Sequence, residues 1–149
     1  MHIWVDADAC PAAIKEILFR AAQRRGIAMT LVANQALQTP RSPLIRSVQV
    51  AQGFDVADRH IIDRLQPGDL TVTADIPLAN EAIAKGSEVI SPRGERLTSD
   101  NIGERLALRN FMDELRGSGG VTGGPAPFNA TDRQAFANAL DRLLTERLA

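Results

Sequence analysis

The sequence predicts an α/β fold of three layers, in which a mostly parallel sheet of about five strands carries helices on both faces. Short apolar segments alternate with longer segments whose apolar residues recur every three or four positions, as they do in helices. Glycine, proline or acidic residues separate most of these segments. With 149 residues, of which 44% are apolar, the chain suits a single domain with one core over residues 1–149.

The first half of the chain supplies three strands and one helix. Asp6 follows the first apolar segment, and Pro11 stands where the first turn of a helix accepts proline. Gly26 ends this helix, because glycine tolerates the left-handed backbone of a helix C-terminus. The predicted elements are strands over 2–5, 28–33 and 45–50 and a helix between Pro11 and Gly26.

The second half supplies two more strands, two short helices and two C-terminal helices. Asp100 can cap the first C-terminal helix, and Thr131 with Gln134 matches the capping box of the second. Between them, the glycine- and proline-rich stretch 117–127 predicts a flexible loop. The predicted elements are strands over 70–73 and 89–90, helices over 56–65 and 77–85, and C-terminal helices that carry Leu108, Phe111, Met112 and Leu115, then Phe136, Ala139, Leu140 and Leu143.

Composition excludes several classes of protein. Cys10 is the only cysteine, so the chain has neither an internal disulfide nor a cysteine-based zinc site. No apolar run reaches membrane-spanning length and no signal peptide is visible, so we expect a cytoplasmic, bacterial-type protein without a membrane partner. The aromatic content of 4% disfavours rows of stacked bases, but the net charge of −1 neither requires nor excludes RNA. RNA and a second copy of the chain, as a homodimer, are the partners to consider.

Polar side chains follow every predicted strand at the point where the strand ends. Ligands of open parallel sheets bind beyond the carboxyl ends of the strands, so these residues are expected to share one edge. They are Asp6 and Asp8 after the first strand, Asn34 after the second, Asp55 and Asp58 after the third, Asp75 after the fourth, and Ser91 and Arg93 after the fifth.

A divalent cation is the expected ligand of this edge. Carboxylates that lie together raise one another's pKa, and Mg²⁺ or Mn²⁺, which prefer oxygen ligands, remove that penalty. Asp58 precedes Ile61 and Ile62 by three and four positions, so it shares their inward helix face. We predict Asp6, Asp58 and Asp75 as metal ligands and Asp8 as a further ligand or a residue that orients water.

Helix capping is the competing explanation for three of the carboxylates. Asp8 precedes the helix at Pro11, Asp55 precedes the helix over 56–65, and Asp75 precedes the helix over 77–85. Each of these residues can serve as an N-cap. Asp6 ends an apolar strand, where no cap is needed. It is therefore the strongest candidate for a functional residue.

Lys15, Asn34 and Arg93 are the candidates for contacts with substrate phosphate, because cationic and amide side chains bind phosphate oxygens. Two other residues have simpler explanations. Asp69 follows a Pro-Gly pair and is most simply a turn residue. Cys10 is most simply a small buried apolar residue.

Six longer motifs are distributed along the chain. They are DADACP at 6–11, VANQ at 32–35, GFDVADRHI at 53–61, GDLTVTADIPLA at 68–79, PRGE at 92–95 and GGPAPF at 123–128. These motifs resemble those of the YaiI/YqxD family of uncharacterised bacterial proteins, over residues 3 to about 140. The resemblance implies a PIN-like fold, and PIN-like nucleases carry acids at the places held here by Asp6, Asp58 and Asp75, with Asp8 as an extra carboxylate and only Glu16 where a further acid usually lies.

The expected function is a hydrolase, a metal-dependent nuclease or related phosphodiesterase acting on RNA, with Asp6, Asp8, Asp58 and Asp75 as its catalytic residues. A second hypothesis is a haloacid-dehalogenase-like phosphatase, in which Asp6 attacks phosphorus and Asp8 is the general acid and base. Cys10 stands where that class usually has threonine. A third hypothesis is a non-catalytic protein that binds a metal or a nucleotide at the same edge.

Overall fold

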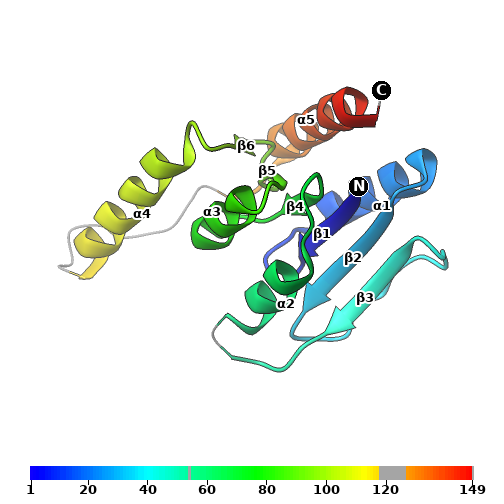
Figure 1. Ribbon diagram of the computed structural model, residues 1–149, viewed down its shortest axis with the longest axis horizontal. Helices are drawn as coiled ribbons and strands as arrows, with labels where there is room; N and C mark the ends of the chain where they lie inside the picture. Colours follow the sequence, from blue (N-terminus) through cyan, green and yellow to red (C-terminus); the bar gives the residue numbers. More distant parts are fainter. Residues whose placement is uncertain (54, 118–126, 149) are drawn as a thin grey trace.

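The computed structural model describes residues 1–53, 55–117 and 127–148, and its α/β architecture confirms the predicted fold class (Figure 1). Six strands form one sheet in the order β3-β2-β1-β4-β5-β6, and only the β5–β6 pair is antiparallel. The elements are β1 (His2–Asp6), α1 (Ala12–Arg25), β2 (Ala28–Ala33), β3 (Ile45–Gln49), α2 (Val56–Arg64), β4 (Leu70–Val72), α3 (Ile76–Ala84), β5 (Glu88–Ile90), β6 (Arg96–Leu97), α4 (Ile102–Gly117) and α5 (Ala130–Leu148).

The strand order places a topological switch point beside β1. From β1 the chain builds outward to β2 and β3 on one side, and then returns to place β4 and β5 on the other. Ligand sites of such sheets lie between the carboxyl ends of the two strands at which the winding reverses. That position lies between Asp6, at the end of β1, and Thr73, directly after β4.

The core consists of two apolar clusters, one on each face of the sheet. Ile3 and Val5 of β1 pack with α1 and α5, whereas Trp4 packs with α2 and α3 on the other face. This alternation follows from the two-residue period of a strand. Ile102 and Leu106, from the first part of α4, join the second cluster.

Strand β6 is absent from the sequence prediction, because two residues carry too little periodicity to reveal a strand. A tight turn after β5 creates it. Gly94 lies in this turn with a φ of 88°, and a Cβ atom there would stand 2.6 Å from the backbone carbon of Ala135 in α5. Glycine is therefore required both for the backbone conformation and for the close approach of α5.

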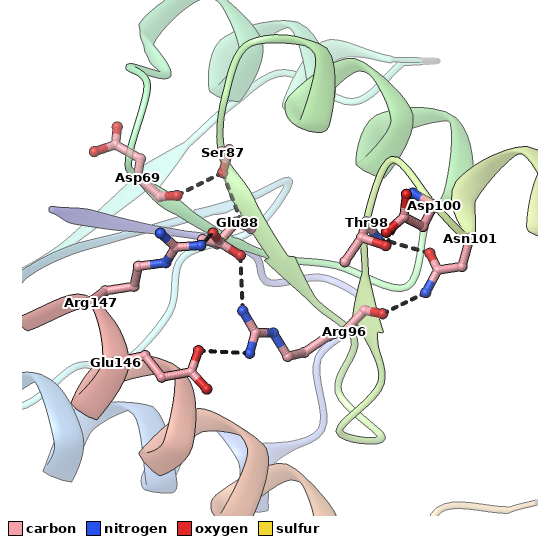
Figure 2. A network of polar contacts seen from close by, with 9 residues as sticks. All are labelled: Asp69, Ser87, Glu88, Arg96, Thr98, Asp100, Asn101, Glu146 and Arg147. Carbon is pink, nitrogen blue, oxygen red and sulfur yellow. Dashed lines mark hydrogen bonds and ion pairs between the residues drawn. The ribbon is translucent and has the colours of Figure 1, made fainter.

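Two predicted caps are wrong by one or two residues. Helix α4 begins after Asn101, not after Asp100. The side chain of Asn101 accepts a hydrogen bond from the backbone N–H of Thr98 at 2.8 Å and donates one to the carbonyl of Arg96 at 2.9 Å (Figure 2). The side chain of Asp100 makes neither contact. Helix α5 begins after Asn129, which exchanges hydrogen bonds with Asp132 in a capping box.

A chain of ion pairs ties the end of α5 to the edge of the sheet (Figure 2). Arg96 of β6 donates to Glu146 at 3.1 Å and to Glu88 at 3.2 Å, and Arg147 pairs with the same Glu88. The predicted loop 117–127 lies almost wholly outside the described residues. No helix within the described ranges is long and apolar enough to span a membrane.

A carboxylate cluster at the switch point of the sheet

Asp6 lies at the switch point as the last residue of β1. Its Oδ2 accepts a hydrogen bond of 2.9 Å from the hydroxyl of Thr73, which follows β4. Burial raises the pKa of Asp6, and the nearby charges of Asp75 and Asp8 raise it further, against the opposing effect of the Thr73 hydrogen bond. The carboxylate is thus held in place, but its charge is poorly stabilised by the protein alone.

Asp75 is both a helix cap and a member of this cluster. Its Oδ1 accepts from the backbone N–H of Leu78 at 3.0 Å, which confirms that it caps α3. Its own backbone N–H donates to the Thr73 hydroxyl at 2.9 Å, so Thr73 joins Asp75 to Asp6. No hydrogen bond to Oδ2 of Asp75 occurs within the described ranges. The capping role therefore uses only one carboxylate oxygen.

Asp58 approaches the same place from α2. As predicted, it lies on the inward side of the helix whose Ile61 and Ile62 are buried. Burial raises the pKa of Asp58 to about 6, with smaller contributions from the carboxylates of Asp75 and Asp6. The three predicted ligands thus come within electrostatic range of one another, although they are far apart in sequence.

Asp8 does not cap α1, because Pro11 holds the N-cap position and no side chain bonds to the first turn. Instead, Oδ2 of Asp8 accepts from the backbone N–H of Asn34 at 2.8 Å. This contact joins the loop after β1 to the loop after β2. The exposed Asp8 carboxylate is held at the rim, where its charge still raises the pKa of Asp6.

Asp55 occupies the N-cap position of α2 without making a capping hydrogen bond. Its φ of 64° is the only positive φ of a non-glycine residue in the described ranges. Its carboxylate adds to the electrostatic effects that raise the pKa of Asp58. Asp55 therefore stands at the predicted N-cap position but does not make the capping hydrogen bond.

The predicted phosphate-binding residues lie in different surroundings. Burial raises the pKa of the Cys10 thiol to about 12. The charge of Lys15 opposes this rise, whereas the charge of Asp6 adds to it. Lys15 belongs to α1, and its charge acts on Cys10. Arg93 donates to Asp132 at 2.9 Å, so its guanidinium already has an acidic partner. Asn34 contributes its backbone N–H to Asp8.

A cavity of about 370 Å³ opens beside Asp58, between α2, α3 and the first part of α4. Asn80 and Leu106 line it, and the ion pair between Arg59 and Glu81 stands at its wall. Sequence patterns did not indicate this cavity, because it depends on where α4 returns to the domain. It provides room for a ligand next to the carboxylates.

Asp6, Asp58 and Asp75 offer oxygen donors, which are the ligand type that hard divalent cations prefer. Within the described ranges no three acidic, histidine or cysteine side chains already meet at one metal-binding point. The expectation of three direct ligands is therefore not supported. Mg²⁺ commonly uses only one or two carboxylates together with water, and mutually destabilised carboxylates are the groups that it would stabilise.

Sequence analysis missed Thr73 and underestimated Asp69. Thr73 is 1% exposed, and its hydroxyl connects Asp6 to Asp75, whereas a pattern of apolar residues shows it only as the end of a strand. Asp69 is not a simple turn residue. It is buried and accepts from the backbone of His2 and Gln66 and from the indole of Trp4, on the opposite edge of the sheet.

Comparisons with known proteins give a consistent result over the whole chain. A model of the YaiI/YqxD family, described as uncharacterised, matches residues 4–146. UPF0178 proteins of Thioalkalivibrio sulfidiphilus and Saccharophagus degradans are 64% and 62% identical over 147 and 148 residues, which cover 99% of this chain and 100% and 98% of those proteins. A UPF0178 protein of Bordetella avium is 64% identical over 149 residues, 100% of this chain and 97% of that protein. No solved structure matches the chain.

Proposed function

The chain belongs to the YaiI/YqxD family of uncharacterised proteins, and we propose that it is a Mg²⁺- or Mn²⁺-dependent phosphodiesterase that cleaves RNA. One observation carries this proposal. Asp6, Asp58 and Asp75 lie within electrostatic range of one another, and the pKa of both Asp6 and Asp58 is raised. Ionisable groups whose pKa is strongly shifted by burial and by neighbouring charges concentrate at functional sites.

The roles of the residues follow from their positions. Asp6 and Asp75, joined through Thr73, would bind the cation directly or through its water molecules. When bound, the cation would polarise a phosphoryl oxygen and lower the pKa of a water molecule. Asp8 stands at the exposed rim, where it can orient that water.

Asp58 is suited to hold or accept a proton beside the cavity. Its pKa of about 6 lies close to neutral pH, where a general base works best. The cavity between α2, α3 and α4 gives a nucleotide room next to this carboxylate. Lys15, on the α1 side, would contribute a positive charge toward a phosphate.

Metal binding is tested first, by thermal unfolding of the wild type and of Asp6→Asn in EDTA and in Mn²⁺. We expect Mn²⁺ to raise the Tm of the wild type through binding to the folded state, and Asp6→Asn to abolish this rise. Asp63→Asn serves as the control, because Asp63 is exposed on α2 and outside the cluster. A well-folded wild type whose Tm does not respond to Mn²⁺ or Mg²⁺ would contradict the proposal.

Catalysis is tested by incubating the purified protein with a pool of labelled RNAs and Mn²⁺. Cleavage that Asp6→Asn eliminates and Asp63→Asn retains would support a phosphodiesterase. A metal-dependent rise in Tm without cleavage would instead indicate a non-catalytic binding protein. A beryllofluoride adduct on Asp6 would indicate a phosphatase that forms an aspartyl-phosphate.

A further inference from the structure

The cavity beside Asp58 has a charge that disfavours phosphate. Asp55, Asp58 and Glu81 line it together with Arg59, so carboxylates outnumber guanidinium groups among the described residues of its wall. Phosphate oxygens are bound by arginine, lysine, hydroxyl, amide and backbone N–H groups, whereas carboxylates repel them. A nucleotide at the carboxylate cluster would therefore keep its phosphate outside this cavity. The base is the part of the nucleotide that can enter it.

The walls of the cavity suit a flat ring. Helices α2, α3 and the first part of α4 pack on one face of the sheet, and the cavity lies where they meet (Figure 1). Its volume of about 370 Å³ falls within the roughly 300–1,000 Å³ of small-molecule sites. Pro77 and Leu106 give it apolar surface, and Arg59, held by its ion pair with Glu81, gives a planar guanidinium. RNA-binding proteins stack unpaired bases on such planes.

Two polar side chains of this wall are available to a ligand. Glu81 already pairs with Arg59, and Asp58 belongs to the carboxylate cluster. The carboxylate of Asp55 makes no capping bond, and neither it nor the amide of Asn80 makes a hydrogen bond or an ion pair within the described ranges. Asp55 reaches the cavity from the start of α2 and Asn80 reaches it from α3. A ligand between these helices can contact both.

We propose that this cavity binds the guanine base of an unpaired RNA nucleotide, and that Asp55 is the residue that selects guanine. The inference rests on the proposed function, because it names the nucleotide beside which the carboxylate cluster would act. Guanine carries two neighbouring donors, N1–H and the N2 amino group, and one carboxylate can accept from both with its two oxygens. The amide of Asn80 can donate to the O6 atom of the same base.

The other three bases lack this pair of donors. Uracil places its single N–H between two carbonyl oxygens, which the carboxylate of Asp55 would repel. Adenine and cytosine offer one amino group beside a ring nitrogen that is itself an acceptor, and a carboxylate has no donor for it. A good bidentate contact discriminates against a wrong base by roughly tenfold to a hundredfold. We expect a preference for guanosine of that size.

The first experiment measures the binding of nucleosides in EDTA by NMR spectra of the amide groups. Guanosine has neither phosphate nor charge, so its binding needs no cation and does not depend on catalysis. We expect guanosine to shift the signals of the Asn80 side chain and of the Leu106 backbone. Inosine, which lacks only the N2 amino group, should bind roughly tenfold more weakly, and uridine should not shift these signals. Equal binding of guanosine and uridine, or no shift at Asn80 with guanosine, would overturn the proposal.

The variant Asp55→Asn tests the assigned residue. Asparagine also accepts the positive φ of this position, and it places a donor where the carboxylate has an acceptor. Guanosine should bind to this variant at least about tenfold more weakly than to the wild type. Asp63→Asn, at an exposed position of the same helix and outside the cavity, should bind guanosine as the wild type does. Unchanged binding in a folded Asp55→Asn variant would contradict the role of Asp55.

The second experiment compares cleavage, in Mn²⁺, of a single-stranded run of uridines and of the same run with one guanosine. We expect cleavage next to the guanosine to be at least about tenfold faster than cleavage between uridines, and Asp55→Asn to remove this difference. Equal cleavage of both RNAs would support the proposed function but overturn the preference for guanine. Cleavage of neither RNA, with guanosine still bound at Asn80, would contradict the proposed function and leave the guanine site in place.

Discussion

Replacing Asp58 with asparagine should stabilise the protein when no divalent cation is present. Burial and the carboxylates of Asp75, Asp6 and Asp55 disfavour the ionised form of Asp58 in the folded state. Within the described ranges its carboxylate makes no hydrogen bond that asparagine would lose. The substitution therefore removes an unfavourable charge and leaves the volume of the side chain almost unchanged.

The size of the effect follows from the pKa of Asp58, which rises from 3.8 to about 6. One pKa unit corresponds to about 1.4 kcal/mol, so this rise sets an upper limit of about 3 kcal/mol. Solvent screens a half-buried carboxylate, which reduces the expected gain to about 1 kcal/mol. For a domain of this size, that gain raises the Tm by about 2–4 °C.

The sign of the pH dependence is set by which state binds the proton more tightly. Because the pKa is higher in the folded state, the wild type loses stability as the pH rises from about 4 to about 6 and stays at the lower value above it. Asp58→Asn lacks this loss. The two proteins should therefore differ above pH 6 and converge below pH 4.

The assay is thermal unfolding in EDTA at several pH values between about 3.5 and 8, across the pKa range of the carboxyl group. Asp63→Asn on the exposed side of α2 is the control and should not change the Tm in the same way. An Asp58→Asn variant that is less stable than the wild type at pH 7.5 would refute the electrostatic reasoning. Addition of Mn²⁺ should then stabilise the wild type more than the variant.

Two further substitutions test the structure away from the cluster. Asp69→Ala should lower the free energy of unfolding by about 2–3 kcal/mol, because three donors, including the buried indole of Trp4, lose their acceptor. Urea unfolding, followed by the fluorescence of the single tryptophan, measures this loss of stability. Gly94→Ala should cost more than about 2 kcal/mol, whereas Gly68→Ala, with the same φ of 88° but open space around its Cβ, should cost only about 1 kcal/mol. Equal costs for the two alanines would show that α5 does not pack tightly on the β5–β6 turn.

Periodicity predicted most of the fold because the centre of the sheet is buried on both faces. Strand β2 has the predicted bounds of Ala28–Ala33, and the other four predicted strands and five predicted helices differ only at their ends. Burial on both faces makes the central strands β1, β2 and β4 short apolar runs, whereas β3 at the edge is mostly exposed. The exception, β6, is a two-residue strand that exists because Gly94 and α5 fold the chain back along β5.

The sequence predicted the acidic residues of the candidate site, but not the hydrogen bonds that hold them in place. Parallel topology places Asp6, Asp58 and Asp75 near the same edge, and sequence order was enough to infer that. The hydroxyl of Thr73 and the backbone N–H of Asn34, which hold Asp6 and Asp8, come from strands that are neighbours only in the folded sheet. A prediction from one strand at a time cannot assign partners across strands.

The sequence by itself determined the α/β class, the order of the elements and the acidic residues at the strand ends, because each of these depends on residues close together in the chain. Only the tertiary structure decided which oxygen of each carboxylate is engaged, that Asp75 both caps α3 and is joined to Asp6 through Thr73, and that Leu108 and Phe111 of α4 are exposed. These depend on contacts between segments far apart in sequence. Local patterns constrain such contacts but do not select them.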